Sequence, residues 1–243
     1  MKRILQTLGA LVVALAMSGG ARAVPLSDLF AGSSITAGDK LFDQWEVMNY
    51  TASDPARSFD AANIEVTALN DGGLDPGPGL SFGVSGGELT VTGDGVFAFV
   101  DLMFGFRASV LDPGLRIKDN SLSITAGSIV SLADGINDNG MSILESIGTV
   151  PGQDDLGIKE VEFSLLDDVL TSAVSDSATF PPQAEIWVTK NILVWATDTS
   201  DTATLSAFEQ RFSQTAVPEP GSALLLTALA LGALGARCLR RRA

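Results

Sequence analysis

The sequence contains no histidine, and its only cysteine, Cys238, lies near the C-terminus. The chain between its two ends therefore cannot form a disulfide, a zinc site of cysteine and histidine, or a Cys–His dyad. A Ser–His–Asp triad is excluded for the same reason. Most common hydrolase and metalloenzyme mechanisms are thereby removed, and we expect no catalytic residue. Only chemistry that uses carboxylates remains open.

Basic residues are scarce, and nearly half of them lie at the two ends. The whole chain has 15 basic and 29 acidic residues. The end segments 1–23 and 221–243 contain no acid, so residues 24–220 hold 8 basic residues against all 29 acidic ones, a net charge of −21. A surface of this sign repels nucleic acids and anionic lipids. It would attract divalent cations, although a solvated acidic surface is the simpler interpretation.

The N-terminus has the three parts of a secretory signal peptide. Lys2 and Arg3 form a positive start, residues 4–17 are almost entirely apolar, and Ala21-Arg22-Ala23 has small residues where signal peptidase requires them. This pattern predicts a signal peptide over residues 1–23 with cleavage after Ala23. The next residue, Val24, is not a cysteine, so the signal is not of the lipoprotein type. An uncleaved anchor helix is the alternative.

The C-terminus combines a short motif, an apolar run and a basic end. The motif is Pro218-Glu219-Pro220, and its two prolines place the start of any helix after it. The uncharged run 222–236 would span roughly 22 Å as a helix, somewhat less than the ~30 Å hydrocarbon core. Snorkelling arginines can extend that reach. The basic end should stay in the cytoplasm, which places the acidic body outside; its residues are Arg237, Arg240, Arg241 and Arg242.

This arrangement resembles the PEP-CTERM sorting signal, in which the same three parts occur in the same order. The resemblance implies that an exosortase recognises Pro218, Glu219 and Pro220 and removes the tail. It further implies a Gram-negative bacterium that makes exopolysaccharide. The protein would pass through the inner membrane, held briefly by its C-terminal helix, to the cell surface or extracellular matrix. A plain single-pass anchor with a chance motif is the alternative.

The middle of the chain predicts an all-β domain over residues 24–214, with the sorting tail at 215–243. Apolar residues alternate with polar ones in short runs, and clusters of Gly, Asp, Asn and Pro separate these runs. Short strands at even spacing favour a β-sandwich, jelly-roll-like, flanked by the signal helix and the membrane helix. The runs are 64–68, 80–84, 96–108, 158–165 and 186–196.

Three further expectations concern particular segments. Residues 34–42 and 187–192 resemble a pattern found in many PEP-CTERM proteins, which supports a shared sandwich but assigns no chemistry. Residues 207–214 are expected to form one or two helical turns. The long run 96–108 is expected to be a central strand, with Val96 among the residues on its apolar face.

An oxygen-rich stretch, Asp134, Asn137 and Asn139 before Gly140, is the candidate for a calcium site. Carboxylate and amide oxygens suit this hard cation. The spacing departs from the EF-hand, because Ser146 stands where the closing glutamate belongs. Turn chemistry explains the cluster more simply, and no other cofactor is expected.

Trp187 and Trp195 are the candidates for sugar contact, since aromatic rings stack on sugars, although aromatic residues in strands more often belong to a core. Among the paired acids, only Glu160 and Glu162 would share one face of a strand, and they are interpreted as its solvent-exposed side. No phosphate-binding loop or basic patch is present, so nucleotide and nucleic-acid binding are not expected.

The sequence thus favours an exported surface or matrix protein without catalytic activity, with signal peptidase and an exosortase as processing partners. The first alternative is a secreted carbohydrate-binding module that acts on exopolysaccharide. The second is a secreted enzyme with a carboxylate pair, which would need two acids roughly 5–10 Å apart in a cleft.

Overall fold

The computed structural model describes residues 22–131 and 138–217. Most of the predicted signal peptide and nearly all of the sorting tail lie outside these ranges. No helix in the part of the chain that the structure describes is long and apolar enough to cross a membrane.

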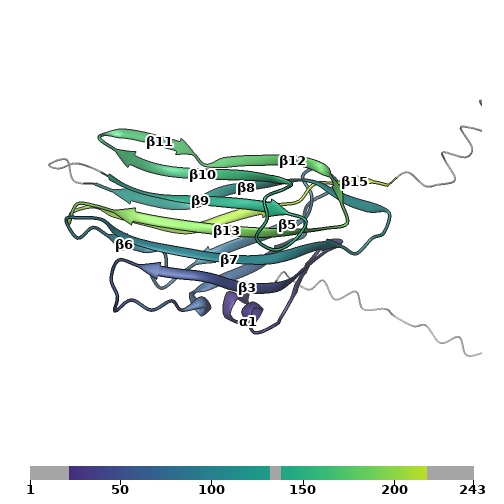
Figure 1. Cartoon of the computed structure of the whole chain (residues 1–243), viewed down its shortest axis with the longest axis horizontal. Coiled ribbons are helices and arrows are strands. Elements are labelled where there is room, and N and C mark those ends of the chain that lie inside the picture. Colours follow the sequence, from purple (N-terminus) through teal and green to yellow (C-terminus); the bar gives the residue numbers. More distant parts are fainter. Residues whose placement is uncertain (1–21, 132–137, 218–243) are drawn as a thin grey trace, which may run out of the picture.

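The described chain is almost entirely β-strand, arranged in two antiparallel sheets that face each other (Figure 1). In sheet A the strand order is β1-β4-β5-β14-β8-β12, with β6 beside β14 and β15 beside β8. Its strands are β1 (Val24–Pro25), β4 (Ile64–Leu69), β5 (Gly79–Val84), β6 (Thr90–Thr92), β8 (Leu115–Val130), β12 (Ser175–Gln183), β14 (Thr202–Arg211) and β15 (Gln214–Ala216).

Sheet B has the order β11-β10-β9-β13-β7-β3-β2, and its strands from β11 to β3 follow one another from top to bottom in Figure 1. A five-residue helix, α1 (Leu26–Phe30), and a 3-10 turn, η1 (Ala61–Asn63), complete the described elements. The strands of sheet B are β2 (Ile35–Ala37), β3 (Lys40–Ala52), β7 (Ala98–Val110), β9 (Asp138–Gly148), β10 (Gly157–Leu166), β11 (Val169–Ala173) and β13 (Glu185–Ala196).

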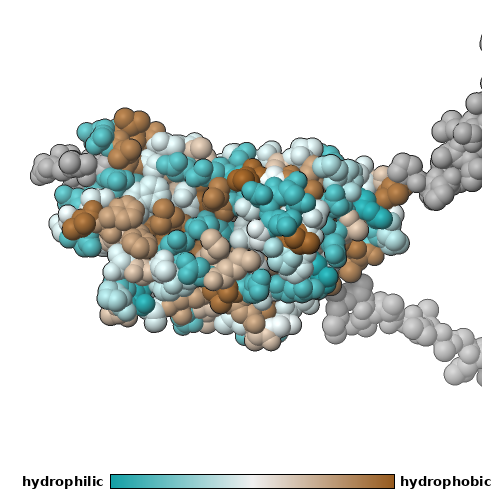
Figure 2. All heavy atoms as spheres, in the orientation of Figure 1, coloured by the Kyte–Doolittle hydropathy of each residue, from teal (hydrophilic) through white to brown (hydrophobic). Residues whose placement is uncertain are grey.

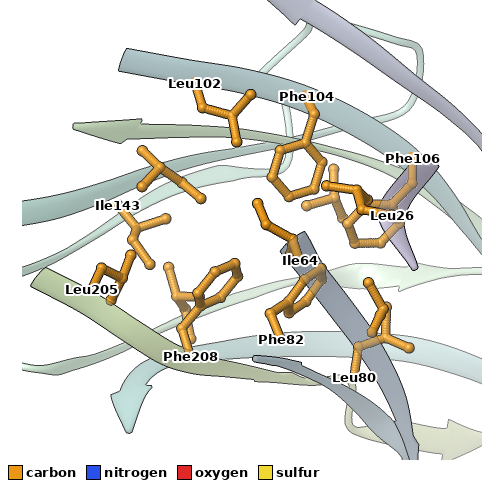
Figure 3. Packing of buried hydrophobic residues seen from close by; sticks show 14 of the residues in the cluster. Leu26, Ile64, Leu80, Phe82, Leu102, Phe104, Phe106, Ile143, Leu205 and Phe208 are labelled. Carbon is orange, nitrogen blue, oxygen red and sulfur yellow. The ribbon is translucent and has the colours of Figure 1, made fainter. Parts of the chain in front are cut away.

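The core lies between the two sheets and is built mainly from alternate residues of the long strands. Aromatic rings from both sheets meet there, as Figure 3 shows for Phe82, Phe104, Phe106 and Phe208. The rings of Phe82 and Phe208 stack with centroids 4.4 Å apart. Each large apolar side chain that is fully buried contributes about 1.5–3 kcal/mol of transfer free energy. This single core holds the outer face of sheet B in a fixed shape.

The predicted all-β class with two packed antiparallel sheets is confirmed. The central strand is confirmed as β7, which lies between β13 and β3, but it begins at Ala98. The placement of Val96 on its apolar face was wrong, because Val96 lies in the preceding turn with 78% of its surface exposed. There the side chain of Asp94 accepts a hydrogen bond from the Val96 amide.

The expected helical turns at residues 207–214 were also wrong, since this segment completes β14 and forms the start of β15. The register shifts between Leu205 and Phe208, where a β-bulge inserts an extra residue. The buried positions therefore step from Leu205 to Phe208 and then to Gln210. That spacing of three imitates a helix in the sequence although the backbone is extended.

Candidate functional site

The outer face of sheet B carries both tryptophans that the sequence proposed for sugar contact. Trp187 and Trp195 lie on β13, and each is partly exposed. The core-facing residues of β13 alternate with them, so both indoles are on the solvent side of the sheet. Eight residues of strand separate them by about 26 Å. They are therefore two separate contacts on one face rather than a single pair.

Trp195 has the more defined surroundings. Its Nε1 donates a hydrogen bond to Oδ1 of Asp138 over 2.8 Å, and its neighbours across the sheet are Gly140 on β9 and Phe99 on β7. A Cβ added at Gly140 would lie 2.8 Å from Cζ2 of Trp195 and 2.5 Å from Cβ of Ser164. The indole therefore crosses Gly140 toward β10, and the glycine makes room for it.

Trp187 lies beside a cluster of charges. Its cross-strand neighbours are Arg107 on β7 and Gly148 on β9. The guanidinium of Arg107 binds Asp43 in bidentate fashion, at 2.9 and 2.8 Å, and reaches Glu185 at 3.4 Å. The hydrogen bonds to Asp43 raise the pKa of Arg107 above its ordinary value. This arginine is thus a fixed positive charge next to the ring.

The loop at residues 149–156 folds back over the outer face next to Trp187. A Cβ added at Gly148 would lie 2.4 Å from the carbonyl oxygen of Gln153. The loop is held by Asp155, whose carboxylate accepts hydrogen bonds of 2.8 Å from both the amide and the hydroxyl of Thr149. These bonds lower the pKa of Asp155.

A small polar pocket of about 230 Å³ opens near Trp195, at the end of this face away from Trp187. Phe99, the cross-strand neighbour of Trp195, lines it together with Ser53, Asp54 and Asp94. Arg57 also lines it, but its guanidinium already donates to three backbone carbonyls at 2.5 to 3.0 Å. The pocket is smaller than the roughly 300–1,000 Å³ typical of drug-sized ligands. It has room for a single small polar group.

Hydrophobic residues do not cover this side of the molecule as one area. Figure 2 shows brown and tan residues scattered among teal ones, with brown gathered at the β10–β11 hairpin in the upper left. Leu166, Val169 and Leu170 of that hairpin are each more than half exposed.

The calcium candidates are only partly within the described residues. Asp134 and Asn137 lie outside them. Asn139 is fully buried, and its Nδ2 donates to the carbonyl of Val130 over 2.9 Å. Among residues 22–131 and 138–217, no group of three or more acidic, histidine or cysteine side chains is arranged to hold a metal. A calcium ion at this stretch stays a prediction from the sequence.

Glu160 and Glu162 lie on the solvent-facing side of β10, as expected. Glu160 is exposed on β10, and Glu162 accepts a hydrogen bond from the hydroxyl of Ser164. Asp167 and Asp168 form the tight turn between β10 and β11, where both have positive φ. Their roles in this region are those of surface and turn residues.

The residues of the terminal signals fall almost wholly outside the structure. Ala21, the Pro218–Glu219–Pro220 motif and the terminal arginines (237, 240, 241 and 242) are not among the described residues. Ala23 is described, and it immediately precedes β1.

A cluster of charges inside the core was not predicted from the sequence. Glu145, Lys159 and Lys190 are all fully or almost fully buried between the sheets. A signal for it is present in the sequence, because Lys190 interrupts the apolar side of β13 between Val188 and Ile192. A charged residue on a core-facing position needs a partner.

No protein-family model and no curated protein matches the sequence. Among solved structures, one similar chain is the carbohydrate-binding module TmCBM61 in complex with β-1,4-galactotriose, with 11% identity and a TM-score of 0.25 over 72% of this chain and 89% of that one. Another is the enzymatically active domain of tailspike protein 4 of bacteriophage CBA120, with 10% identity and a TM-score of 0.20 over 71% of this chain and 19% of that one. Likenesses this weak carry no argument about function.

Proposed function

We propose that the chain is an exported, non-enzymatic surface or matrix protein of a Gram-negative bacterium, processed at both ends. The observation that carries this proposal is where the strands begin and end. β1 starts at Val24, the residue after the predicted signal peptidase site, and β15 ends at Ala216, two residues before Pro218. Cleavage after Ala23 and removal of the chain from Pro218 onward would leave every described strand intact.

The charge distribution supports the same route. The acidic residues all lie in 24–220, whereas the arginine cluster lies at the extreme C-terminus. A body that is repelled by anionic lipid and a tail held by cytoplasmic arginines suit a protein that pauses in the inner membrane and then leaves it. The exosortase would recognise Pro218, Glu219 and Pro220.

The strand order supports a jelly roll as the finer description of the body. In a jelly roll of eight strands, two four-stranded sheets have the orders 1-8-3-6 and 2-7-4-5. Numbering β5, β7, β8, β9, β10, β12, β13 and β14 from 1 to 8 reproduces both orders, as β5-β14-β8-β12 and β7-β13-β9-β10.

The sorting proposal is tested by cell fractionation in the organism that makes the protein. A variant with Pro218→Ala and Glu219→Gln should accumulate in the inner membrane and lose its surface fraction. The matched control is Glu160→Gln, which also removes one carboxylate but from an exposed strand position. Equal surface fractions for both variants would refute recognition of the motif.

Carbohydrate binding by the outer face of sheet B is a second candidate function. The specific observation is the Trp195 indole, which is partly exposed, crosses Gly140 and lies beside Phe99 at the edge of a polar pocket. An aromatic ring held in this way can stack on a sugar ring while nearby carboxylates accept hydrogen bonds from the sugar hydroxyls. Exopolysaccharide is the expected ligand.

Affinity electrophoresis in gels that contain exopolysaccharide from the producing strain tests this second function. Trp195→Ala should weaken the affinity for exopolysaccharide by about tenfold, and Trp187→Ala should weaken it by an independent amount. Leu170→Ala, a change at an exposed apolar residue of the same sheet, serves as the control. Retardation that is unchanged in both tryptophan variants would rule out this face.

A further inference from the structure

Five polar side chains meet in the core between the two sheets. Glu145 on β9, Lys159 on β10 and Lys190 on β13 come from sheet B, whereas Asn120 on β8 and Gln210 on β14 come from sheet A. None of them has more than 1% of its surface exposed. Such a group is costly to bury unless its members satisfy one another.

Lys159 is the centre of this cluster. Its Nζ contacts two groups at once, Oε1 of Glu145 at 2.6 Å and the side-chain carbonyl oxygen Oδ1 of Asn120. Glu145 is in turn bound by Lys190 through Oε2 and by Nε2 of Gln210 at 2.9 Å. The amine of Lys159 is therefore in direct contact with both an amide carbonyl and a carboxylate.

The cluster contains two amines but only one carboxylate. Lys190 Nζ also faces the rings of Phe82 and Phe208, at 5.8 and 5.7 Å from their centroids. Burial lowers the pKa of Lys190 to about 8 and lowers the pKa of Lys159 as well. Burial alone would raise the pKa of Glu145, but the two ammonium groups outweigh it and lower that pKa. Loss of one proton from an amine relieves the excess positive charge and leaves a nucleophile.

The side chain of Asn120 contains a hydrogen-bond donor that lacks an acceptor in the described part of the chain. This donor is Nδ2, which is buried. An unpaired buried donor is unfavourable. Removal of this nitrogen would eliminate the unpaired group, while the carbonyl oxygen beside Lys159 would remain.

We propose that Lys159 and Asn120 react with each other to form an isopeptide bond between β10 and β8. The bond Nζ–Cγ forms, and the bond Cγ–Nδ2 breaks. Lys159 begins with three protons on Nζ and keeps one in the amide; the other two pass by way of the Glu145 carboxylate to Nδ2, which leaves as ammonium. Glu145 ends as the carboxylate that it was at the start, and no oxidant or reductant takes part.

This bond would connect sheet A to sheet B covalently. Exported proteins commonly use disulfides to limit the freedom of the unfolded chain. Residues 24–220 contain no cysteine, so that route is closed to them. The proposal does not depend on what the outer face binds or on how the tail is sorted.

Mass spectrometry of the purified, denatured protein tests the bond. The intact mass should be lower than the sequence mass of the same polypeptide by about 17 Da, the mass of ammonia. Trypsin does not cut after an acylated lysine, so it should leave residues 119–190 as one peptide that carries this mass loss. Lys190 is the internal control, because its described hydrogen bond is to Glu145 and not to an amide carbonyl. Cleavage after Lys190 shows that digestion was complete.

Two variants provide the controls. Asn120→Ala removes the acceptor, and Lys159→Arg removes the nucleophile; each should restore the full mass, and Asn120→Ala should restore cleavage after Lys159. A wild-type protein of unmodified mass that is cut after Lys159 would overturn the proposal. A loss of about 17 Da with normal cleavage after Lys159 would overturn it too, because that result indicates cyclisation of an asparagine onto its own backbone rather than a bond to Lys159.

Discussion

Glu145 is the residue on which the charge balance of the core depends. It is the shared partner of Lys159 and Lys190, which approach different oxygens of its carboxylate. A buried ion cluster adds little net stability when it is complete, since desolvation offsets the attraction. Removal of one member is a different case, because it leaves a charge without compensation. The cluster is therefore sensitive to single substitutions although its net contribution is small.

Replacement of Glu145 by glutamine should destabilise the fold by about 3–5 kcal/mol, because Lys159, which needs this carboxylate to react, and Lys190 would both remain as buried amines without a counter-charge. Urea unfolding followed by fluorescence measures this change. Glu160→Gln is the matched control, since it removes the same charge from an exposed position on β10 and should change the free energy of unfolding by less than about 0.5 kcal/mol. Equal midpoints for the two variants would contradict the assignment of Glu145.

Lys190 should make stability depend on pH on the alkaline side. Its pKa is about 8 in the folded protein, against 10.5 as the ordinary value. Between these two values the unfolded chain binds more protons than the folded one, so the free energy of unfolding should rise with pH, by at most about 3 kcal/mol. Below pH 8 Lys190 is protonated in both the folded and the unfolded chain, so it no longer makes stability depend on pH. Desolvation, the largest cause of the shift, acts with or without a bond at Lys159.

Urea unfolding at about pH 7 and about pH 10 in wild type and Lys190→Met measures this dependence. The variant lacks the titrating amine, so the difference between the two proteins isolates the contribution of Lys190. If the free energy of unfolding changes equally in the wild type and in Lys190→Met between these two pH values, the lowered pKa of Lys190 is contradicted.

At the level of elements, alternation of apolar residues located β4, β5, β7, β10 and β13, whereas β3, β8, β9 and β12 were not predicted. β7 and β13 face the core with every second residue, and Trp187 and Trp195 lie on the opposite side of β13. β14 was missed because its bulge breaks the alternation between Leu205 and Phe208. The helix α1 was also missed, since five residues are too few to show a helical period.

The contacts of the candidate site could not be predicted in the same way. The bond from Trp195 to Asp138 and the meeting of Lys159 with Asn120 join residues 57 and 39 positions apart in the chain. Such contacts depend on which strands are neighbours and on their register. Local patterns fix the face of a strand but not its partner.

Two glycines of β5 offer a test of the packing between strands. A Cβ added at Gly79 would lie 2.0 Å from the backbone carbonyl oxygen of Gln210 on β14, whereas one added at Gly83 meets nothing within 4 Å. Gly79→Ala should therefore destabilise the protein by about 1–3 kcal/mol or more, because the backbone of β5 or β14 must shift to make room for the methyl group. Gly83→Ala should be neutral within about 0.5 kcal/mol.

Thermal unfolding of both glycine variants distinguishes them. The expected result is a lower midpoint for Gly79→Ala alone. Equal midpoints would mean that β5 and β14 are not paired in the register seen here, in which Gly79 is opposite Arg211.

At the scale of the whole molecule, the account separates an acidic folded body from two terminal addresses. The body supplies a sandwich with an aromatic and polar outer face, and we propose that the ends direct it across and out of the inner membrane. The absence of cysteine from residues 24–220 means that any covalent reinforcement of this body must come from other side chains. Lys159 and Asn120 are the pair that the core places in contact.

The most direct test of the central claim is the intact mass of the protein recovered from the surface or matrix of cells that possess the exosortase. We predict a chain that begins at Val24 and lacks the arginines of residues 237–242. A surface protein that still begins at Met1, or that still ends in Arg240-Arg241-Arg242-Ala243, would contradict the account.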